Sequence, residues 1–109
     1  MLNEDSAIVI LITCGDKQEA QNISSVLVSN NLIACGNILS DVTSIFRWEN
    51  RIENEEEVLL IAKSRQARFD AIIQKVKELH SYQTPEIIAL PVVAGSEDYL
   101  KWLVDETSG

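Results

Sequence analysis

Residues 7–13 read AIVILIT, a run in which every side chain is aliphatic or β-branched. Such a short run has the length of a strand, and apolar side chains at every position indicate a strand that is covered on both faces. Residues 87–93 (IIALPVV) repeat this pattern near the other end of the chain. Pro91 has no N–H group to donate to a neighbouring strand, which places this second strand at a sheet edge or at a bulge. Together the two runs predict a sheet with two apolar faces.

A helix is predicted directly after the first strand. Cys14-Gly15-Asp16 interrupts the apolar run, and Asp16 followed by Glu19 is a capping-box pattern. Asn30-Asn31 ends the helical pattern. The apolar residues between these signals recur at helical spacing and are Ala20, Ile23, Leu27 and Val28. This stripe predicts that the helix packs one side on the sheet.

A long hairpin is predicted in the middle of the chain. Residues 32–48 change towards a period of two, with Gly36 and Ser40-Asp41 marking bends or bulges. Asn50 lies at the predicted tip, and residues 52–63 form the returning strand.

Two further helices complete the chain. The first of them is predicted to end near His80, because residues 81–85 (SYQTP) favour turn and extended backbone. Its apolar stripe consists of Phe69, Ile72, Ile73, Val76 and Leu79. The last helix is predicted to begin after Ser96, since Glu97 and Asp98 place negative charge in its first turn.

The predicted order is therefore β-α-β-β-α-β-α, in a single domain that spans residues 1–109. Both crossover connections should be right-handed, so the first two helices lie on one face of a four-stranded sheet. This is an α+β fold of the ferredoxin-like, split βαβ type, with an added C-terminal helix.

The predicted sheet has more apolar surface than two helices on one side can cover. Along the first strand one face carries Ile8, Ile10 and Ile12 and the other carries Val9 and Leu11, and along the last strand Ile87, Ala89 and Val93 alternate with Ile88, Leu90 and Val92. Leu59 and Ile61 repeat the pattern on the third strand, so five or more aliphatic side chains point away from the two helices. Each is worth roughly 1.5–3 kcal/mol when buried, so leaving the outward set in water is unfavourable. We therefore expect a homo-oligomer, to which the hairpin with Phe46 and Trp48 contributes.

Charge and composition narrow the classes of partner. Nine basic and seventeen acidic side chains give a net charge of −8 and a pI near 4.5. This sign disfavours nucleic acid and anionic membrane surfaces, and no apolar run approaches the roughly 20 residues of a membrane span. The acidic N-terminus is unlike a secretory signal, so we expect a cytoplasmic protein with Cys14 and Cys35 as reduced thiols.

Several short motifs follow one another in a fixed order. They are residues 34–38 (ACGNI), 42–49 (VTSIFRWE), 56–60 (EEVLL), 78–82 (ELHSY), 84–91 (TPEIIALP) and 99–102 (YLKW). Together they resemble the CutA family of divalent-cation tolerance proteins over nearly the whole chain. The resemblance implies a homotrimer of ferredoxin-like subunits with a PII-like architecture, and a link to copper and other divalent cations. It implies no enzymatic reaction, and the sequence shows no nucleophile or paired-carboxylate motif, so we expect that the protein is not an enzyme.

His80 and Cys35 are the candidate metal ligands. His80 is the one histidine of the chain, imidazole binds copper and zinc well, and the resemblance implies a metal role at this position. The competing interpretation is that His80 stabilises a helix end or a subunit contact. Cys35 matches a cysteine of the family, and its soft sulfur suits Cu(I), although a buried cysteine usually only packs. Cys14 lies two residues after another candidate thiol position of the family, and its role is left open.

The resemblance also places Trp48, Lys63, Tyr82 and Glu86 around a cleft between subunits. An ammonium, a phenol and a carboxylate beside an indole suit a small anionic or zwitterionic ligand. The alternative is that these residues form salt bridges and packing contacts at the interface. The acidic stretch Glu53–Glu57 is predicted to be a solvated face of the hairpin with weak attraction for cations.

These residues predict a trimeric tolerance protein that binds divalent cations, copper especially, weakly through His80 and Cys35. Their spacing matches no local metal motif, so such a site would be assembled in space. One alternative is a PII-like regulatory trimer that binds a small ligand in the intersubunit cleft, and another is a scaffold for partner proteins. None of these functions requires a cofactor.

Overall fold

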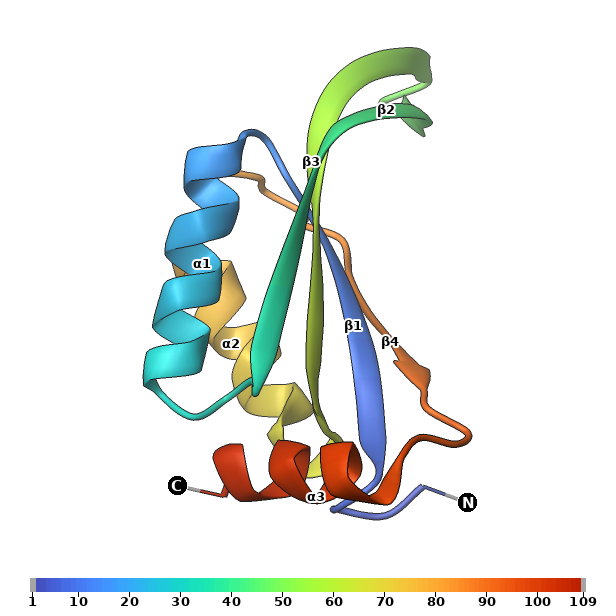
Figure 1. The fold of residues 1–109 in the computed structure, drawn as a ribbon. Helices are drawn as coiled ribbons and strands as arrows, with labels where there is room; N and C mark the ends of the chain where they lie inside the picture. Colours follow the sequence, from blue (N-terminus) through green and yellow to red (C-terminus); the bar gives the residue numbers. More distant parts are fainter. Residues whose placement is uncertain (1, 109) are drawn as a thin grey trace.

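The computed structural model describes residues 2–108, in which strands and helices follow the predicted order (Figure 1). The elements are β1 (Ala7–Cys14), α1 (Lys17–Ser29), β2 (Cys35–Trp48), β3 (Arg51–Arg65), the 3₁₀ turn η1 (Gln66–Arg68), α2 (Phe69–Leu79), β4 (Ile87–Pro91) and α3 (Glu97–Glu106). The strands pair antiparallel in the order β2-β3-β1-β4. The predicted α+β ferredoxin-like fold is therefore confirmed, with β4 at an edge as Pro91 indicated.

The start of α1 follows the predicted capping pattern. The Asp16 side chain accepts a hydrogen bond from the Glu19 N–H at 2.8 Å, and the Glu19 carboxylate accepts one from the Gly15 N–H at 2.9 Å. Gly36, which the sequence assigns to a bend, instead lies in regular β2 pairing. A Cβ atom there would come within 2.2 Å of the Ser24 hydroxyl oxygen on α1. Gly36 therefore allows helix and strand to approach closely.

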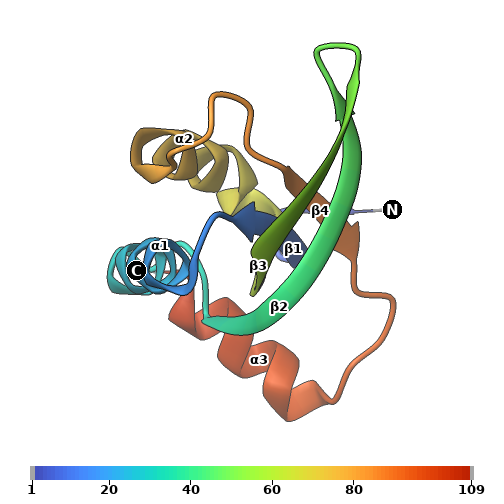
Figure 2. The same ribbon diagram turned by 90° about the horizontal axis from the view of Figure 1, so that it is seen from above.

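One face of the sheet, called the covered face below, packs against α1 and α2 (Figure 2). Its buried core includes Ile8, Ile10, Ile12, Cys14, Leu60 and Ala62 from the sheet and Ala20, Ile23, Leu27, Ile72 and Val76 from the helices. The prediction is wrong at Val28, which is 43% exposed because it lies about 100° round the helix from Leu27. The prediction that the last strand runs to Val93 is also wrong, because β4 ends at Pro91 and Val93 is 96% exposed. Val93 follows the end of β4 at Pro91, so it no longer shares the alternation of that strand.

The opposite face of the sheet, called the bare face below, is also apolar. Its aliphatic side chains are Val9, Leu11, Leu39, Leu59, Ile61, Ile88 and Leu90. Leu39, Ile88 and Leu90 are 44%, 49% and 50% exposed. α1 and α2 lie on the other side, and α3 crosses one end of the sheet (Figure 2), where the Tyr99 hydroxyl is 3.8 Å from Cys35 Sγ. The structure thus confirms the prediction that the sheet carries more apolar side chains than its two helices cover.

β2 and β3 extend beyond the other strands as a curled hairpin (Figure 1). The predicted irregularity is present: the register shifts after Leu39, and Asp41 has a φ of 62°. The tip consists of Glu49-Asn50, both with positive φ, as in two-residue hairpin turns. The hairpin therefore carries Trp48 away from the core.

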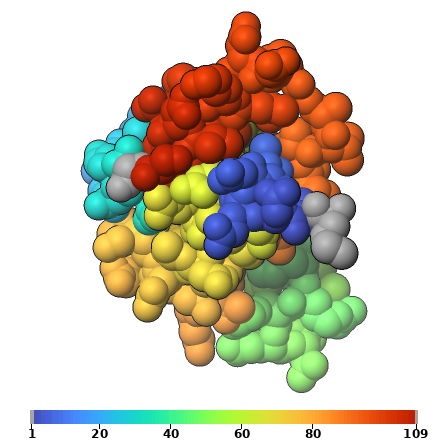
Figure 3. All heavy atoms as spheres, turned by 90° about the horizontal axis from the view of Figure 1, so that it is seen from below, coloured from blue at the N-terminus to red at the C-terminus, as the bar shows by residue number. Residues whose placement is uncertain are grey.

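α3 closes one end of the molecule beside the N-terminal segment (Figure 3). Arg65 Nε donates to the Thr107 hydroxyl at 3.0 Å, and Arg68 Nε donates to the Thr107 carbonyl at 2.6 Å. The Ser96 hydroxyl caps the helix, as predicted. These contacts tie the end of α3 to the end of β3. None of the helices in residues 2–108 is long and apolar enough to cross a bilayer.

Candidate functional site

His80 follows the last turn of α2 and is buried against the end of β1. Its side chain is fully buried, and Nε2 lies 2.7 Å from the carbonyl oxygen of Thr13. Because a carbonyl oxygen only accepts, Nε2 carries the proton and donates it. Nδ1 accepts a hydrogen bond from the Tyr82 N–H at 3.0 Å. His80 is therefore a neutral imidazole with both nitrogens engaged, and it fastens the turn after α2 to β1.

Cys14 and Glu19 lie next to His80 where β1 leads into α1. One thiol, carboxylate or imidazole atom from each of the three residues lies within 4.8 Å of the other two. Burial first, and then the negative charges of Glu19, Asp16 and Glu57, raise the pKa of the Cys14 thiol to about 12. Cys14 is therefore a neutral thiol at physiological pH.

Glu19 is the charged member of this cluster. Burial by itself would raise the pKa of its carboxyl group, but donors from Gly15 and Ser81 outweigh burial and lower the pKa. The Gly15 N–H donates at 2.9 Å and the Ser81 N–H at 2.8 Å. The cluster of Cys14, Glu19 and His80 thus holds a single negative charge.

The donor types of the Cys14–Glu19–His80 cluster fit a zinc or copper ion. Thiolate sulfur, carboxylate oxygen and imidazole nitrogen all bind these metals. If a divalent ion replaced the Cys14 proton, the thiolate and the Glu19 carboxylate would balance its charge. The ion would also have to displace the Tyr82 N–H from Nδ1, since Nε2 is protonated. Binding thus requires the loss of one proton and one hydrogen bond.

Sequence reasoning found one member of this cluster and missed the grouping. The sequence pattern assigns Glu19 only to a helix cap and leaves Cys14 open. Cys14 is the last inward-facing residue of β1, and a capping-box carboxylate after such a strand end is the signal that could have joined them.

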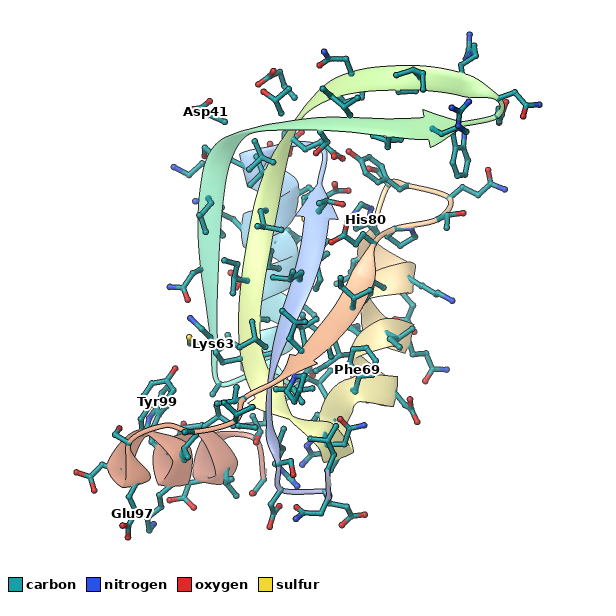
Figure 4. All side chains as sticks on the ribbon, turned by 90° about the vertical axis from the view of Figure 1, so that its right-hand side faces the viewer. Asp41, Lys63, Phe69, His80, Glu97 and Tyr99 are labelled. Carbon is teal, nitrogen blue, oxygen red and sulfur yellow. The ribbon has the colours of Figure 1, made fainter. Side chains whose placement is uncertain are left out.

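Cys35 lies at the opposite end of the sheet from His80. Cys35 on β2 pairs with Lys63 on β3. Lys63 and Tyr99, which belongs to α3, are labelled at this end of the sheet in Figure 4. The β1 residue opposite Lys63 precedes Thr13 by four positions, which is about 13 Å along a strand. Because Thr13 is the partner of His80, the two predicted metal ligands do not meet within one chain.

A cleft of about 800 Å³ opens between the hairpin and the segment that precedes β4. Trp48, Tyr82 and Glu86, three of the four predicted cleft residues, line it. Lys63 lies outside the lining and donates to the side chain of Asn37. The structure therefore separates the expected ammonium group from the other three side chains.

The acidic side of the hairpin also lines this cleft. Glu53, Glu55 and Glu57 alternate along β3 and all contribute to the lining. Glu57 is only 7% exposed, so the prediction of a solvated face is wrong at this residue. The curl of the hairpin over the sheet is the physical reason, because it encloses side chains that an extended hairpin would leave in water.

Tyr82 connects the cleft to the His80 cluster. Its backbone N–H donates to His80, while its hydroxyl donates to the Glu57 carboxylate at 2.6 Å. Burial raises the pKa of Tyr82, and the hydrogen bond to Glu57 and the charge of that carboxylate raise it further. The rings of His80 and Tyr82 lie 4.6 Å apart. Tyr82 therefore contacts both His80 and Glu57, a residue in the wall of the cleft.

Fold and donor groups together define a ferredoxin-like protein with a candidate metal site. Residues 8–106 match the family model described as CutA1 divalent ion tolerance protein. The divalent-cation tolerance protein CutA of Thermus thermophilus is 40% identical over 99 residues, which are 91% of this chain and 96% of that protein. The protein of that name from Yersinia pestis is 42% identical over 98 residues, 90% of this chain and 82% of that protein. This chain belongs to the CutA1 divalent ion tolerance family.

Solved structures agree with this assignment. The crystal structure of CutA1 from the psychrotrophic bacterium Shewanella sp. SIB1 superposes with a TM-score of 0.93 at 35% identity, and the match covers all of both chains. Similarity at this level supports the whole fold, including the long hairpin and α3.

Proposed function

We propose that this protein acts in divalent-cation tolerance by binding a metal ion, copper above all, at the Cys14–Glu19–His80 cluster. The support is membership of the CutA1 family together with one observation: three donor atoms of different chemistry converge within 4.8 Å. His80 keeps the ligand role that the sequence predicts. Cys35 would take part in metal binding only in a site built from more than one subunit.

Metal uptake at this cluster is coupled to proton release. The Cys14 thiol, whose pKa is about 12, must lose its proton before sulfur can bind the ion. Affinity is therefore modest near neutral pH and increases as the pH rises. Reversible binding of this kind suits a protein that responds to excess metal.

Calorimetric titration of the purified protein with Cu²⁺ and with Zn²⁺ tests this site. Cys14→Ser is expected to remove most of the binding heat, while Cys35→Ser, the same substitution at the far end of the sheet, retains it. Unchanged binding in Cys14→Ser would contradict the proposed site. Loss in Cys35→Ser alone would move the metal to a subunit interface.

We also propose that the protein is a cytoplasmic homotrimer assembled through the bare face. The half-exposed aliphatic side chains of this face support assembly, and the free thiols of Cys14 and Cys35 suit a reducing compartment. Light scattering at micromolar concentration should give three times the chain mass of 12.2 kDa. A mass of one chain would contradict the trimer.

The cleft supports a second candidate function, a PII-like regulatory trimer that binds a small ligand. A volume of about 800 Å³ lies within the range of small-molecule sites, and Trp48 and Tyr82 provide aromatic walls. A ligand that binds there should raise the melting temperature of the wild type and have less effect on Trp48→Ala. A screen of metals and metabolites without any shift would instead favour a scaffold for partner proteins.

A further inference from the structure

The connection between α2 and β4 is held by side chains of the proposed metal site. The Ser81 N–H donates to Glu19 Oε2 at 2.8 Å, and the Tyr82 N–H donates to His80 Nδ1 at 3.0 Å. These two acceptor atoms lie 3.9 Å apart. His80 itself stands where α2 gives way to the connection (Figure 4). Donor atoms of the Cys14–Glu19–His80 cluster therefore already accept hydrogen bonds from two consecutive backbone N–H groups.

The two acceptors differ in whether they can bind an ion and keep their hydrogen bond. A carboxylate oxygen has two lone pairs, so Glu19 Oε2 can coordinate an ion and still accept from Ser81. An unprotonated imidazole nitrogen has only one lone pair. Nε2 of His80 donates to the Thr13 carbonyl oxygen at 2.7 Å, which leaves Nδ1 for coordination. At Nδ1, an ion and the Tyr82 N–H compete for the same lone pair.

The ion and the Tyr82 N–H also exclude each other in space. A metal ion lies about 2 Å from an imidazole nitrogen that coordinates it. The Tyr82 nitrogen is 3.0 Å from Nδ1 along its hydrogen bond, so an ion there would come within about 1 Å of that nitrogen. The Tyr82 peptide group therefore has to move when the site is filled.

Tyr82 is the first residue of the segment 82–86 and its main attachment. Its hydroxyl donates to the Glu57 carboxylate at 2.6 Å, and its ring lies 4.6 Å from that of His80. The rest of the segment is exposed apart from Pro85, which is half-buried. A segment with few buried contacts opens at low free-energy cost. Its position therefore depends chiefly on the contacts of Tyr82.

We propose that filling the Cys14–Glu19–His80 cluster with a metal ion releases segment 82–86 from its docked position. Ser81 keeps its bond to Glu19 and marks the hinge, while Tyr82 leaves both His80 and Glu57. Because residues of this segment line the cleft, the metal-free and metal-bound proteins present different cleft walls. This inference rests on the proposed metal function and adds a structural signal to it.

Amide hydrogen exchange of the full-length protein, followed by NMR with and without Zn²⁺, tests the proposal. Zn²⁺ is the probe because its filled d shell causes no paramagnetic broadening. At saturating Zn²⁺, exchange of the Tyr82 amide should accelerate by about tenfold or more, the effect of one lost hydrogen bond. The Ser81 amide is the internal control and should keep its protection. Ring-nitrogen chemical shifts of His80 should show coordination at Nδ1 with Nε2 still protonated.

Matched variants test whether docking and metal binding compete. Tyr82→Phe removes the hydroxyl that holds the docked segment to Glu57, so it should tighten Zn²⁺ binding by about fivefold. A purely structural role of the hydroxyl would leave the affinity unchanged or weaken it. Tyr99→Phe is the control, because it removes a hydroxyl on α3 that lies 3.8 Å from Cys35 Sγ. It should bind Zn²⁺ as the wild type does.

Two results would overturn the proposal: a Tyr82 amide that stays protected at saturating Zn²⁺, or equal Zn²⁺ affinity of the wild type and Tyr82→Phe. Calorimetric titration of the same preparation separates these outcomes from failure of the metal function. Zn²⁺ binding heat without a change at the Tyr82 amide would remove the release of the segment alone. Absence of Zn²⁺ binding heat would remove both the metal function and the release.

Discussion

The covered and bare faces of the sheet are built from nearly the same side chains but differ in what protects them from water. On β1, Ile10 is fully buried under α1 and α2, whereas Leu11, its neighbour in sequence, points to the face without those helices. On β4, Ile88 and Leu90 remain about half exposed. Apolar side chains at every position of a strand therefore indicate that both faces of the strand are buried in the assembled protein. This pattern does not show which of the two faces is buried by helices of the same chain.

The two cysteines repeat this contrast. Cys14 faces inward at the end of β1, is fully buried and is held as a neutral thiol. Cys35 faces outward at the start of β2, is partly exposed and lies beside Lys63 and Tyr99. The covered face thus holds the closed, hydrogen-bonded cluster, while the bare face leads into the open acidic cleft.

The largest effect is expected from a charge on the bare face. If the proposed trimer assembles through the bare face, Ile61→Glu should dissociate it, because a carboxylate buried in an apolar interface without a partner is strongly unfavourable. Light scattering should show the mass of one chain. Val28→Glu, on the solvent side of α1, is the control and should leave the mass unchanged. A trimer that tolerated Ile61→Glu would mean that the bare face is not the interface.

A cavity in the covered face should have the next largest effect. Ile10→Ala should lower the free energy of unfolding by about 2–5 kcal/mol, through lost burial and an unfilled cavity. Val28→Ala should change it by less than about 0.5 kcal/mol. Denaturant unfolding at one protein concentration measures both. Similar values for the two variants would contradict the packing of the covered face.

The Cys14 thiol should make stability depend on pH in the alkaline range. Its pKa rises from 9.0, the ordinary value, to about 12 in the folded protein. Above pH 9 the unfolded chain loses this proton while the folded chain keeps it, so stability falls as the pH rises towards 12. Unfolding measured between these values should show the decline in the wild type and in Cys35→Ala.

Cys14→Ala tests whether this decline belongs to the thiol. It should flatten that part of the pH profile, whatever its effect on stability at neutral pH. An equally steep profile in Cys14→Ala would assign the decline to other groups.

The smallest effect is expected at Val93, which lies two residues beyond the end of β4. Val93→Ser should change the free energy of unfolding by less than about 0.5 kcal/mol and leave the mass unchanged, because the side chain is almost fully exposed beyond β4. A clear loss of stability or mass would mean that the segment after Pro91 is packed against the rest of the protein or against another subunit.

Most of the fold was predictable because its signals are local. The Asp16 cap, the Glu49-Asn50 turn near the expected tip, the end of α2 at His80 and the edge position of β4 each depend on a few neighbouring residues. The two errors have different origins: Val28 lies within α1 but about 100° round the helix from Leu27, whereas Val93 lies two residues beyond the end of β4. Local periodicity therefore leaves uncertain both the edge of an apolar stripe and the last residue of a strand.

The candidate sites were less predictable because they depend on distant segments. His80 and Cys35 could each be identified as a donor, yet register places them at opposite ends of the sheet. Glu19 joins His80 through the packing of α1 beside α2, which no spacing in the sequence encodes. Glu57 becomes buried only because the hairpin curls and Tyr82 meets it from another segment.

Taken alone, the amino-acid sequence determined the order of the elements, the caps and turns between them, and the excess of apolar side chains over available helix. These properties follow from backbone preferences and from periods of two and 3.6 residues, which act over short distances. Only the tertiary structure decided that Cys14 and Glu19 lie next to His80, and that Lys63 lies outside the cleft, which carboxylates line. Register, strand curl and helix packing set those distances, because they bring together residues far apart in the chain.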